Sequence, residues 1–206
     1  ITTDQSALRA LKSHVTFDPS DVLSRSWINQ IPVCNWTGVK CSSLHQRVVA
    51  LNISHLGLQG NIPPQVANLS FLNSIDISGN DFQGNLPEEL VHLQRLSYIN
   101  FSFNKFSGGV PSWLGFLPNL QYLYLANNSF TGILPSSLFN ASKLEDMRIP
   151  YSQLEGIIAE EIGNLGNLKI LDLQDNELMG SIPRTLFNIS SLQVITLTNN
   201  SLSGTL

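Results

Sequence analysis

Apolar residues recur along most of the chain with a period of 24 residues, and a short stretch of each period alternates apolar and polar positions. Leu120, Leu123 and Leu125 show the spacing Leu-x-x-Leu-x-Leu most clearly. Its last part predicts a short strand whose leucines face a core while the residues between them face outward. Further apolar residues, such as Leu90 and Leu93, indicate a short helical turn. Each period therefore predicts one strand and one turn.

Three further positions of the repeat keep the same 24-residue spacing. We call each set of equivalent positions in successive repeats a column. A glycine recurs every 24 residues without a slip, at Gly60, Gly84, Gly108, Gly132, Gly156, Gly180 and Gly204. An asparagine precedes most of these glycines by four residues, and a proline follows most of them by three; Leu56 and Ser152 interrupt the asparagine column, and Ala159 the proline column. The asparagine amide can bond backbone groups that a bend leaves unpaired. Because no single repeat can bury its own apolar face, the repeats must stack into a solenoid.

The motifs match a known family. Residues 168–184 resemble the signature of plant-type leucine-rich repeats, Leu-x-x-Leu-x-Leu-x-x-Asn-x-Leu-x-Gly-x-Ile-Pro. The start of the chain resembles the N-terminal cap of plant leucine-rich-repeat receptor kinases, through a predicted helix from Asp4 to about His14 and a Cys-x-Trp-x-Gly-Val-x-Cys segment from Cys34 to Cys41. Among plant receptor kinases, the sequences of the cap and the repeats are most similar to the immune-receptor subfamily.

The resemblance implies an α/β solenoid: a right-handed superhelix with a concave parallel β-sheet, short 3-10 or helical turns on the convex side, and a helical cap. Plant members often add a second short sheet. We expect the cap at 1–47 and about six and a half repeats at 48–206, an N-terminal fragment without a C-terminal cap. The family also implies a membrane-spanning helix and a Ser/Thr kinase in the full-length protein, neither of which lies in this chain.

The cysteines and glycosylation motifs favour a secreted protein. Cys34 and Cys41 have no histidines at metal-ligand spacing, so a single disulfide is favoured over free thiols, which implies an oxidising compartment. Candidate N-glycosylation motifs occur at Asn35, Asn52, Asn68, Asn100, Asn127, Asn140, Asn188 and Asn199. We therefore expect N-linked glycans and an extracellular location at the plasma membrane.

Composition excludes several classes of function. Only 13% of the residues are charged, and the net charge of −4 argues against a nucleic-acid partner. No apolar run reaches the ~18 residues that suggest a membrane span. The pairs Glu88–Glu89 and Glu160–Glu161 could serve as acid and base, but both more simply complement the start of a helical turn. We expect no catalytic residue, no metal and no cofactor in this chain.

The fixed register identifies the residues that face outward between the strand leucines. Aromatic and charged residues gather there in the third to sixth repeats, and they form our candidate ligand surface: Tyr98, Phe103, Tyr122, Tyr124, Asp146, Arg148, Tyr151 and Asp172. Tyr and Arg are enriched at binding hot spots, and Arg148 could hold a ligand carboxylate. The alternative is that the tyrosines only reflect the preference of aromatic residues for strands.

The resemblance implies that the chain is an extracellular domain of a plant receptor kinase in immune pattern recognition. We expect it to bind a peptide or protein ligand and to signal through a leucine-rich-repeat co-receptor kinase. Three alternatives use the same fold: a secreted inhibitor of a cell-wall-degrading enzyme, a receptor for a developmental peptide hormone, and a structural wall protein.

Overall fold

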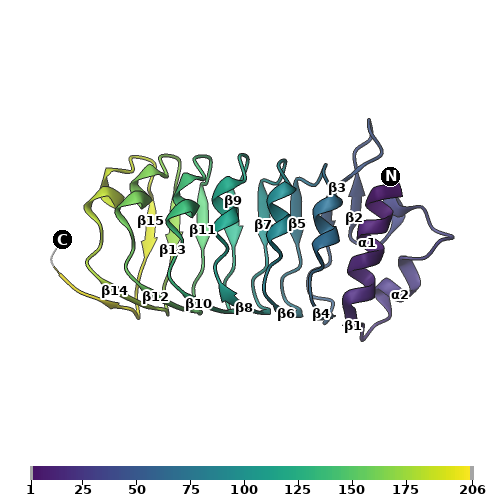
Figure 1. Ribbon diagram of the computed structural model, residues 1–206, viewed down its shortest axis with the longest axis horizontal. Coiled ribbons are helices and arrows are strands. Elements are labelled where there is room, and N and C mark those ends of the chain that lie inside the picture. Colours follow the sequence, from purple (N-terminus) through teal and green to yellow (C-terminus); the bar gives the residue numbers. More distant parts are fainter. Residues whose placement is uncertain (1, 205–206) are drawn as a thin grey trace.

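The alternating stretches form one long sheet, as predicted. The structure is a computed structural model that describes residues 2–204. One strand per repeat pairs in parallel with the strand of the next repeat, and a cap strand adds antiparallel at one end. We call this sheet 1; it contains β2 (Val39–Cys41), β3 (Val48–Asn52), β5 (Ser74–Asp76), β7 (Tyr98–Asn100), β9 (Tyr122–Tyr124), β11 (Asp146–Arg148), β13 (Ile170–Asp172) and β15 (Val194–Thr196). Figure 1 shows these strands side by side along an elongated molecule.

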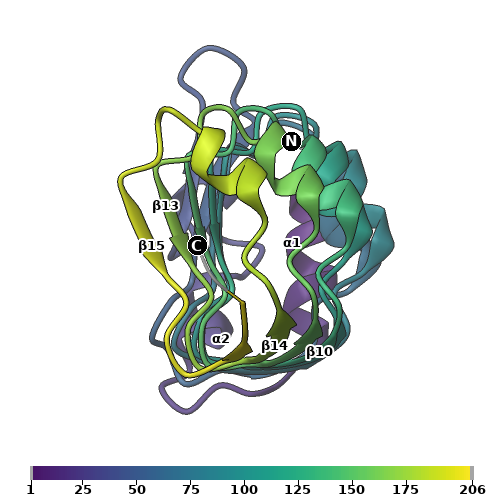
Figure 2. The ribbon, with the colours of Figure 1, turned by 90° about the vertical axis from the view of Figure 1, so that its left-hand side faces the viewer.

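A second sheet and a row of turns complete each coil. Sheet 2 contains β1 (Val15–Phe17), β4 (Gln59–Gly60), β6 (Asp81–Gly84), β8 (Lys105–Gly109), β10 (Ser129–Gly132), β12 (Gln153–Gly156), β14 (Glu177–Gly180) and β16 (Ser201–Leu202). The 3-10 turns of the repeats are η2 (Pro64–Asn68), η3 (Glu88–His92), η4 (Ser112–Phe116), η5 (Ser136–Asn140), η6 (Glu160–Asn164) and η7 (Arg184–Asn188). The end-on view in Figure 2 shows the two sheets and the turns as three sides of one coil.

The core runs along the inside of the coil. Most strand leucines that the pattern assigned to the core are fully buried, including Leu120, Leu123 and Leu125, whereas Leu192 and Leu197 of the last repeat are partly buried. Phenylalanines from the column two residues before the glycine stack between repeats, with the ring centroids of Phe82 and Phe106 6.5 Å apart. Full burial of one such side chain contributes roughly 1.5–3 kcal/mol. Most of this burial involves the neighbouring coil, so the repeats stabilise one another.

The asparagine column forms a ladder of hydrogen bonds at the bend after sheet 1. Asn104 is buried, and its Nδ2 donates to the carbonyls of Ile77 (3.0 Å), Phe101 (3.1 Å) and Ser102 (3.3 Å). Its Oδ1 accepts the N–H of Phe82 at 2.9 Å. Each side chain therefore bonds its own repeat and the preceding one. Similar bonds recur at Asn80, Asn128, Asn176 and Asn200.

Ser152 interrupts this ladder between Asn128 and Asn176. Its hydroxyl is too short to span the bend, and its Oγ is buried without a hydrogen-bond partner among the described residues. A buried hydroxyl without a partner costs stability. The bend of this repeat is therefore less well bonded than its neighbours.

The cap covers the first repeat with two helices and a disulfide loop. Helix α1 (Thr2–His14) buries Ala7, Leu8 and Leu11, as its apolar spacing predicted. Helix α2 (Val22–Ser26) and the 3-10 turn η1 (Val33–Asn35) follow. The disulfide between Cys34 and Cys41 is present. It closes a loop in which Trp36 stacks on Trp27, with ring centroids 5.4 Å apart.

A buried ion pair connects the cap to the first repeat. Asp4 is fully buried and accepts hydrogen bonds from Arg47 Nε (2.8 Å), Arg47 Nη2 (2.7 Å) and the Val48 N–H (2.9 Å). Burial by itself raises the pKa of Asp4, but these hydrogen bonds and the guanidinium charge outweigh it and leave the pKa below its ordinary value. The carboxylate therefore holds α1 to the start of β3.

We expect Asp4→Asn to lower the free energy of unfolding by about 3 kcal/mol at pH 7, because it leaves the Arg47 charge without its partner. The lowered pKa means that the Asp4 contribution is present above the ordinary value of 3.8 and is lost as the pH falls through the folded-state pKa. Urea unfolding at pH 7 and near pH 2 should show the difference between variant and wild type shrinking at low pH. The control Asp21→Asn disrupts an exposed pair with Arg25 and should change stability by less than about 1 kcal/mol. Equal losses in both variants would contradict this role.

We expect Ser152→Asn to raise the free energy of unfolding by about 1 kcal/mol, because the amide can restore the ladder bonds made in neighbouring repeats. The reverse change at an intact position, Asn104→Ser, should lower it by about 1–3 kcal/mol. Urea denaturation of both variants measures these changes. A neutral or destabilising Ser152→Asn would show that the bend does not need the missing amide.

Candidate functional site

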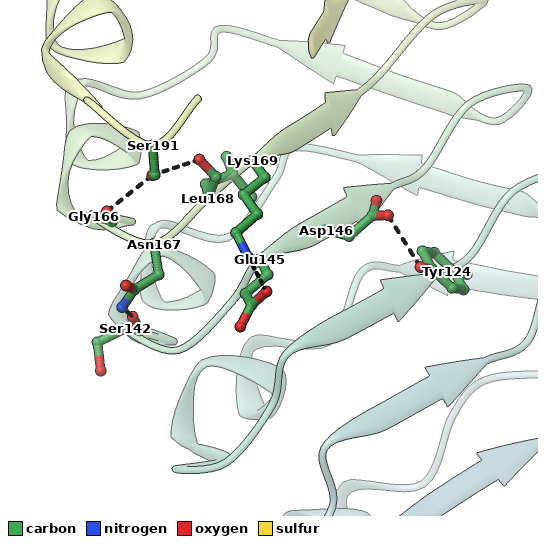
Figure 3. Close-up of polar contacts among 9 residues, drawn as sticks. All are labelled: Tyr124, Ser142, Glu145, Asp146, Gly166, Asn167, Leu168, Lys169 and Ser191. Carbon is green, nitrogen blue, oxygen red and sulfur yellow. Dashed lines mark hydrogen bonds and ion pairs between the residues drawn. The ribbon is translucent and has the colours of Figure 1, made fainter. Parts of the chain in front are cut away.

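The centre of sheet 1 carries an ion pair and a tyrosine hydroxyl on neighbouring strands. Asp146 and Arg148 stand two apart on β11 and therefore share a face. Arg148 Nε lies 2.8 Å from Asp146 Oδ1, and Arg148 Nη2 lies 2.9 Å from Asp146 Oδ2. The hydroxyl of Tyr124 on β9 donates to Asp146 Oδ2 at 3.0 Å, as Figure 3 shows. Arg148 Nη1 makes no hydrogen bond within residues 2–204 and remains free for a ligand.

Burial and charge set the protonation of these groups. Burial raises the pKa of Tyr124, and the charge and hydrogen bond of Asp146 raise it further. Burial also raises the pKa of Tyr98, with a further contribution from the negative charge of Asp76. The hydrogen bond to Asp146 raises the pKa of Arg148. Near neutral pH the site therefore presents protonated phenols and a permanent cation.

Three tyrosines pack around this ion pair. The ring centroids of Tyr98 and Tyr124 lie 5.6 Å apart in an edge-to-face arrangement, and those of Tyr98 and Tyr122 lie 6.2 Å apart. Arg148 Cζ lies 5.5 Å from the centroid of the Tyr124 ring. Such aromatic and cation–π contacts hold the rings in defined positions. Together these rings form an aromatic floor across β7 and β9, beside Arg148 on β11.

Two aromatic residues occupy a column with left-handed backbone. Phe103 has φ 57° and Tyr151 has φ 55°, and the same column also contains His55, Gly79, Asn127, Asp175 and Asn199. Gly, Asn and Asp adopt this conformation most easily, whereas a bulky side chain is strained there. Phe103 is nevertheless 57% exposed and Tyr151 49% exposed, so neither ring contributes fully to a core. Strain combined with exposure indicates a role at the surface.

A hollow of about 490 Å³ lies between the aromatic floor and this column, at the carboxyl ends of the sheet 1 strands. Five of the eight predicted residues line it: Phe103, Tyr124, Arg148, Tyr151 and Asp172. Asp146 lies outside the lining and fixes Arg148 and Tyr124, while Tyr98 and Tyr122 pack beside the hollow. The structure thus brings most of the predicted set together. Whether the set binds a ligand stays a prediction.

Sequence reasoning did not identify several residues that line the hollow. Ser78, Ser102, Ala126, Pro150 and Gln174 belong to one column, two residues beyond the end of each strand. The 24-residue register could have identified this column, because it directly precedes the left-handed column. Its residues are small or polar and carry no conspicuous chemistry, so composition did not single them out.

The same column contains Pro150, which stands two residues after Arg148. In four other repeats, the N–H at this position donates to the side chain two residues earlier, as Ser78 does to Asp76 Oδ1 at 3.0 Å. Arg148 has no acceptor to offer, and Pro150 has no N–H to satisfy. Ser152, one of the two exceptions in the asparagine column, and Ala159, the exception in the proline column, belong to the same repeat. The repeat with the most scaffold exceptions therefore lies at the hollow.

The predicted glycosylation motifs fall into different environments. Asn68, Asn140 and Asn188 are exposed at the ends of turns η2, η5 and η7, away from sheet 1. Asn100 and Asn127 line the hollow, where a glycan would obstruct it. Glycosylation at these sites stays a prediction.

Neither a metal centre nor a membrane span is found in the described part of the chain. Within residues 2–204, no three side chains among His, Cys, Asp and Glu are grouped so that they could hold a metal ion. No helix in the same range combines the length and the apolar character needed to cross a bilayer.

The stacked coils, the asparagine ladder and the disulfide-closed cap define a capped leucine-rich-repeat solenoid. Residues 1–42 match the family of leucine-rich-repeat N-terminal domains, and residues 71–93, 95–117, 119–141 and 167–189 match the leucine-rich-repeat family. The two together cover more than half of the chain, which therefore belongs to the leucine-rich-repeat proteins.

Its relatives are plant receptor kinases. A leucine-rich-repeat receptor-like serine/threonine-protein kinase of Arabidopsis thaliana is 46% identical over 78 residues, which is 38% of this chain and 8% of the relative. The crystal structure of PEPR1 with AtPEP1 matches with a TM-score of 0.94 and 35% identity, over 100% of this chain and 29% of that one.

The Arabidopsis receptor kinase HAESA, solved with the peptide hormone IDA and the co-receptor SERK1, matches with a TM-score of 0.88 and 32% identity, over 96% of this chain and 33% of that one. The present chain thus spans about a third or less of the solved ectodomains, and its aligned part spans less than a tenth of the curated relative.

We expect Phe103→Asn to raise the free energy of unfolding by roughly 1 kcal/mol, because Asn tolerates the left-handed backbone better than Phe. Chemical denaturation of wild type and variant measures the change. Asn127→Phe places an aromatic ring in the same column and should cost a similar amount. If Phe103→Asn destabilises the protein, Phe103 contributes to packing and its exposure is not a sign of function.

Proposed function

We propose that this chain is part of the extracellular ligand-recognition domain of a plant receptor kinase and that it binds an extended peptide along sheet 1. The observation that carries this proposal is the hollow in which Phe103 and Tyr151 remain exposed on a strained backbone beside Tyr124 and Arg148. Natural chains retain such strain where the side chain is needed for function. Rigid aromatic rings and Arg are also the residue types that dominate binding energy at interfaces.

The arrangement suggests how a peptide would lie. An extended segment crossing the strands can place apolar side chains between Phe103 and Tyr151, and its backbone against the floor that contains Tyr124. Because Asp146 holds two of the three guanidinium nitrogens of Arg148, the ligand meets Nη1. The Nη1 side of the guanidinium suits a peptide carbonyl or carboxylate. Asp172, on the next strand, can accept an N–H or pair with a cation.

The solved relatives support the proposal that the chain belongs to a ligand-binding receptor kinase. PEPR1 and HAESA are each described in complex with a peptide, and HAESA also with a co-receptor. By the same likeness we propose an extracellular location at the plasma membrane, signalling through a co-receptor, and a Ser/Thr kinase in the full-length protein. Immune pattern recognition is our proposal for the biological role; peptide hormone perception is the alternative favoured by the HAESA complex.

Selection of random 12-residue peptides displayed on phage against the wild-type protein supplies a probe without a known ligand. Synthetic copies of the selected peptides are then titrated by calorimetry. We expect Phe103→Ala/Tyr151→Ala to weaken binding by at least about tenfold, which corresponds to about 1.4 kcal/mol. Arg148→Gln should weaken it by a similar factor.

The matched control is Phe116→Ala/Phe187→Ala, which removes two rings of similar exposure from the turns η4 and η7. Its affinity should stay within about twofold of wild type. Circular dichroism melts verify that all variants fold. Equal affinity of Phe103→Ala/Tyr151→Ala and the wild type, or a failure to select any peptide, would refute peptide binding in this hollow.

A further inference from the structure

A second hollow with different chemistry lies at the opposite ends of the sheet 1 strands. We call this row of strand ends the amino edge of sheet 1. The hollow measures about 620 Å³ and lies at the amino ends of β5, β7, β9 and β11. Its lining residues are all polar and include no carboxylate: Asn73, Arg95, Ser97, Asn119, Gln121 and Lys143. No aromatic residue lines this hollow. A ligand here would be recognised by hydrogen bonds and charge.

The two cations of this hollow are held in place without a negative partner. The guanidinium carbon of Arg95 lies 4.0 Å from the centroid of the Phe71 ring, so the guanidinium packs over that ring. Lys143 Nζ donates to Asn119 Oδ1 at 2.7 Å. Within residues 2–204 neither forms an ion pair, although the chain has a net charge of −4. Two cations without a carboxylate partner, on a chain of net negative charge, favour an anionic ligand.

The hydrogen-bonding groups repeat at the spacing of the coils. Ser97 Oγ donates to Asn73 Oδ1 at 2.9 Å, and Asn119 Nδ2 donates to the carbonyl of Gln94 at 2.9 Å. Adjacent strands lie about 4.8 Å apart, so Arg95 and Lys143, two coils apart, are separated by about 10 Å along the solenoid. The edge thus offers a regular array of amides and hydroxyls with a cation on every second coil.

Similar hydrogen bonds to the preceding coil occur in later repeats, as Figure 3 shows for Asn167 and Ser191. Asn167 Nδ2 donates to the carbonyl of Ser142 at 2.7 Å, and Ser191 Oγ donates to the carbonyl of Leu168 at 2.7 Å. Glu145 is the carboxylate nearest in sequence to Lys143, but it pairs with Lys169 at 2.6 Å. Its charge is therefore largely compensated, and the edge remains suitable for an anion.

We propose that this edge binds an acidic oligosaccharide, a linear polymer whose sugar units each carry hydroxyls and a carboxylate. A repeating ligand matches a repeating array, hydroxyls pair with the Asn, Gln and Ser groups, and carboxylates pair with Arg95 and Lys143. An acidic peptide matches the two cations but brings no hydroxyls to the amides. This inference stands apart from the peptide groove, because the two hollows lie at opposite ends of the strands and share no lining residue.

The test uses a purified octamer of α-1,4-linked galacturonic acid, titrated by calorimetry into the folded chain at low and moderate salt. We expect measurable binding that weakens as salt rises, and a loss of at least about tenfold in Arg95→Gln/Lys143→Gln. The fully methyl-esterified octamer keeps the length and most hydroxyls but loses the charge, and it should bind at least about tenfold more weakly.

Two control variants test whether the effect is specific to Arg95 and Lys143. Lys40→Gln/Arg184→Gln removes the same charge from two exposed cations that form no ion pair within the described residues, and it should retain binding. Phe103→Ala/Tyr151→Ala should also retain it, whatever happens to peptide binding.

Unchanged affinity in the Arg95/Lys143 variant, or an equal loss in the Lys40/Arg184 variant, would overturn the site. Equal or tighter binding of a poly-glutamate octamer would overturn the assignment to a saccharide and indicate an acidic peptide instead.

Discussion

The asparagine side chains at the bend after sheet 1 connect each coil to the one before it, and the rest of the structure depends on that connection. A bend leaves backbone carbonyls and N–H groups without partners, and inside a core such groups would be costly. Asn104 bonds three carbonyls and one N–H across two repeats. This keeps successive coils in one register, so that the leucines stack into one core and the strands into one sheet. The cap protects the first coil, with Asp4 and Arg47 as its buried attachment.

The same register separates scaffold from specificity. Columns that point inward on sheet 1 hold mostly Leu, Ile, Val and Phe, with Met147 as an exception, while columns that point outward vary freely. The fifth repeat departs from the scaffold at Ser152 and Ala159, and it carries Arg148 and Pro150 where four other repeats have an acceptor and an N–H donor. Arg148 and Pro150 line the hollow, and Ser152 directly follows Tyr151, which also lines it. The arrangement is that of a protein that gives up some local stability where its surface must be distinctive.

Sheet 1 also presents different chemistry at its two edges. The carboxyl ends of the strands combine aromatic rings with an ion pair, and the amino ends combine amides, hydroxyls and two unpaired cations. The edges are separate because each strand is only three residues long in most repeats and its ends belong to different columns. One solenoid can therefore hold two ligands of unlike chemistry without competition for the same side chains.

The sequence alone determined the fold and the list of outward-facing residues, because a strict 24-residue period leaves one way to stack the coils. It predicted the disulfide, the helix from Asp4 to His14 and the sheet that carries Tyr98, Tyr124 and Arg148. Only the tertiary structure decided how those residues combine. The pairing of Asp146 with Arg148 and Tyr124, the strain at Phe103 and Tyr151, and the stacking of Arg95 on Phe71 all depend on rotamers and backbone angles. A column position places a residue on a face, but packing between neighbouring coils decides which partner its side chain meets.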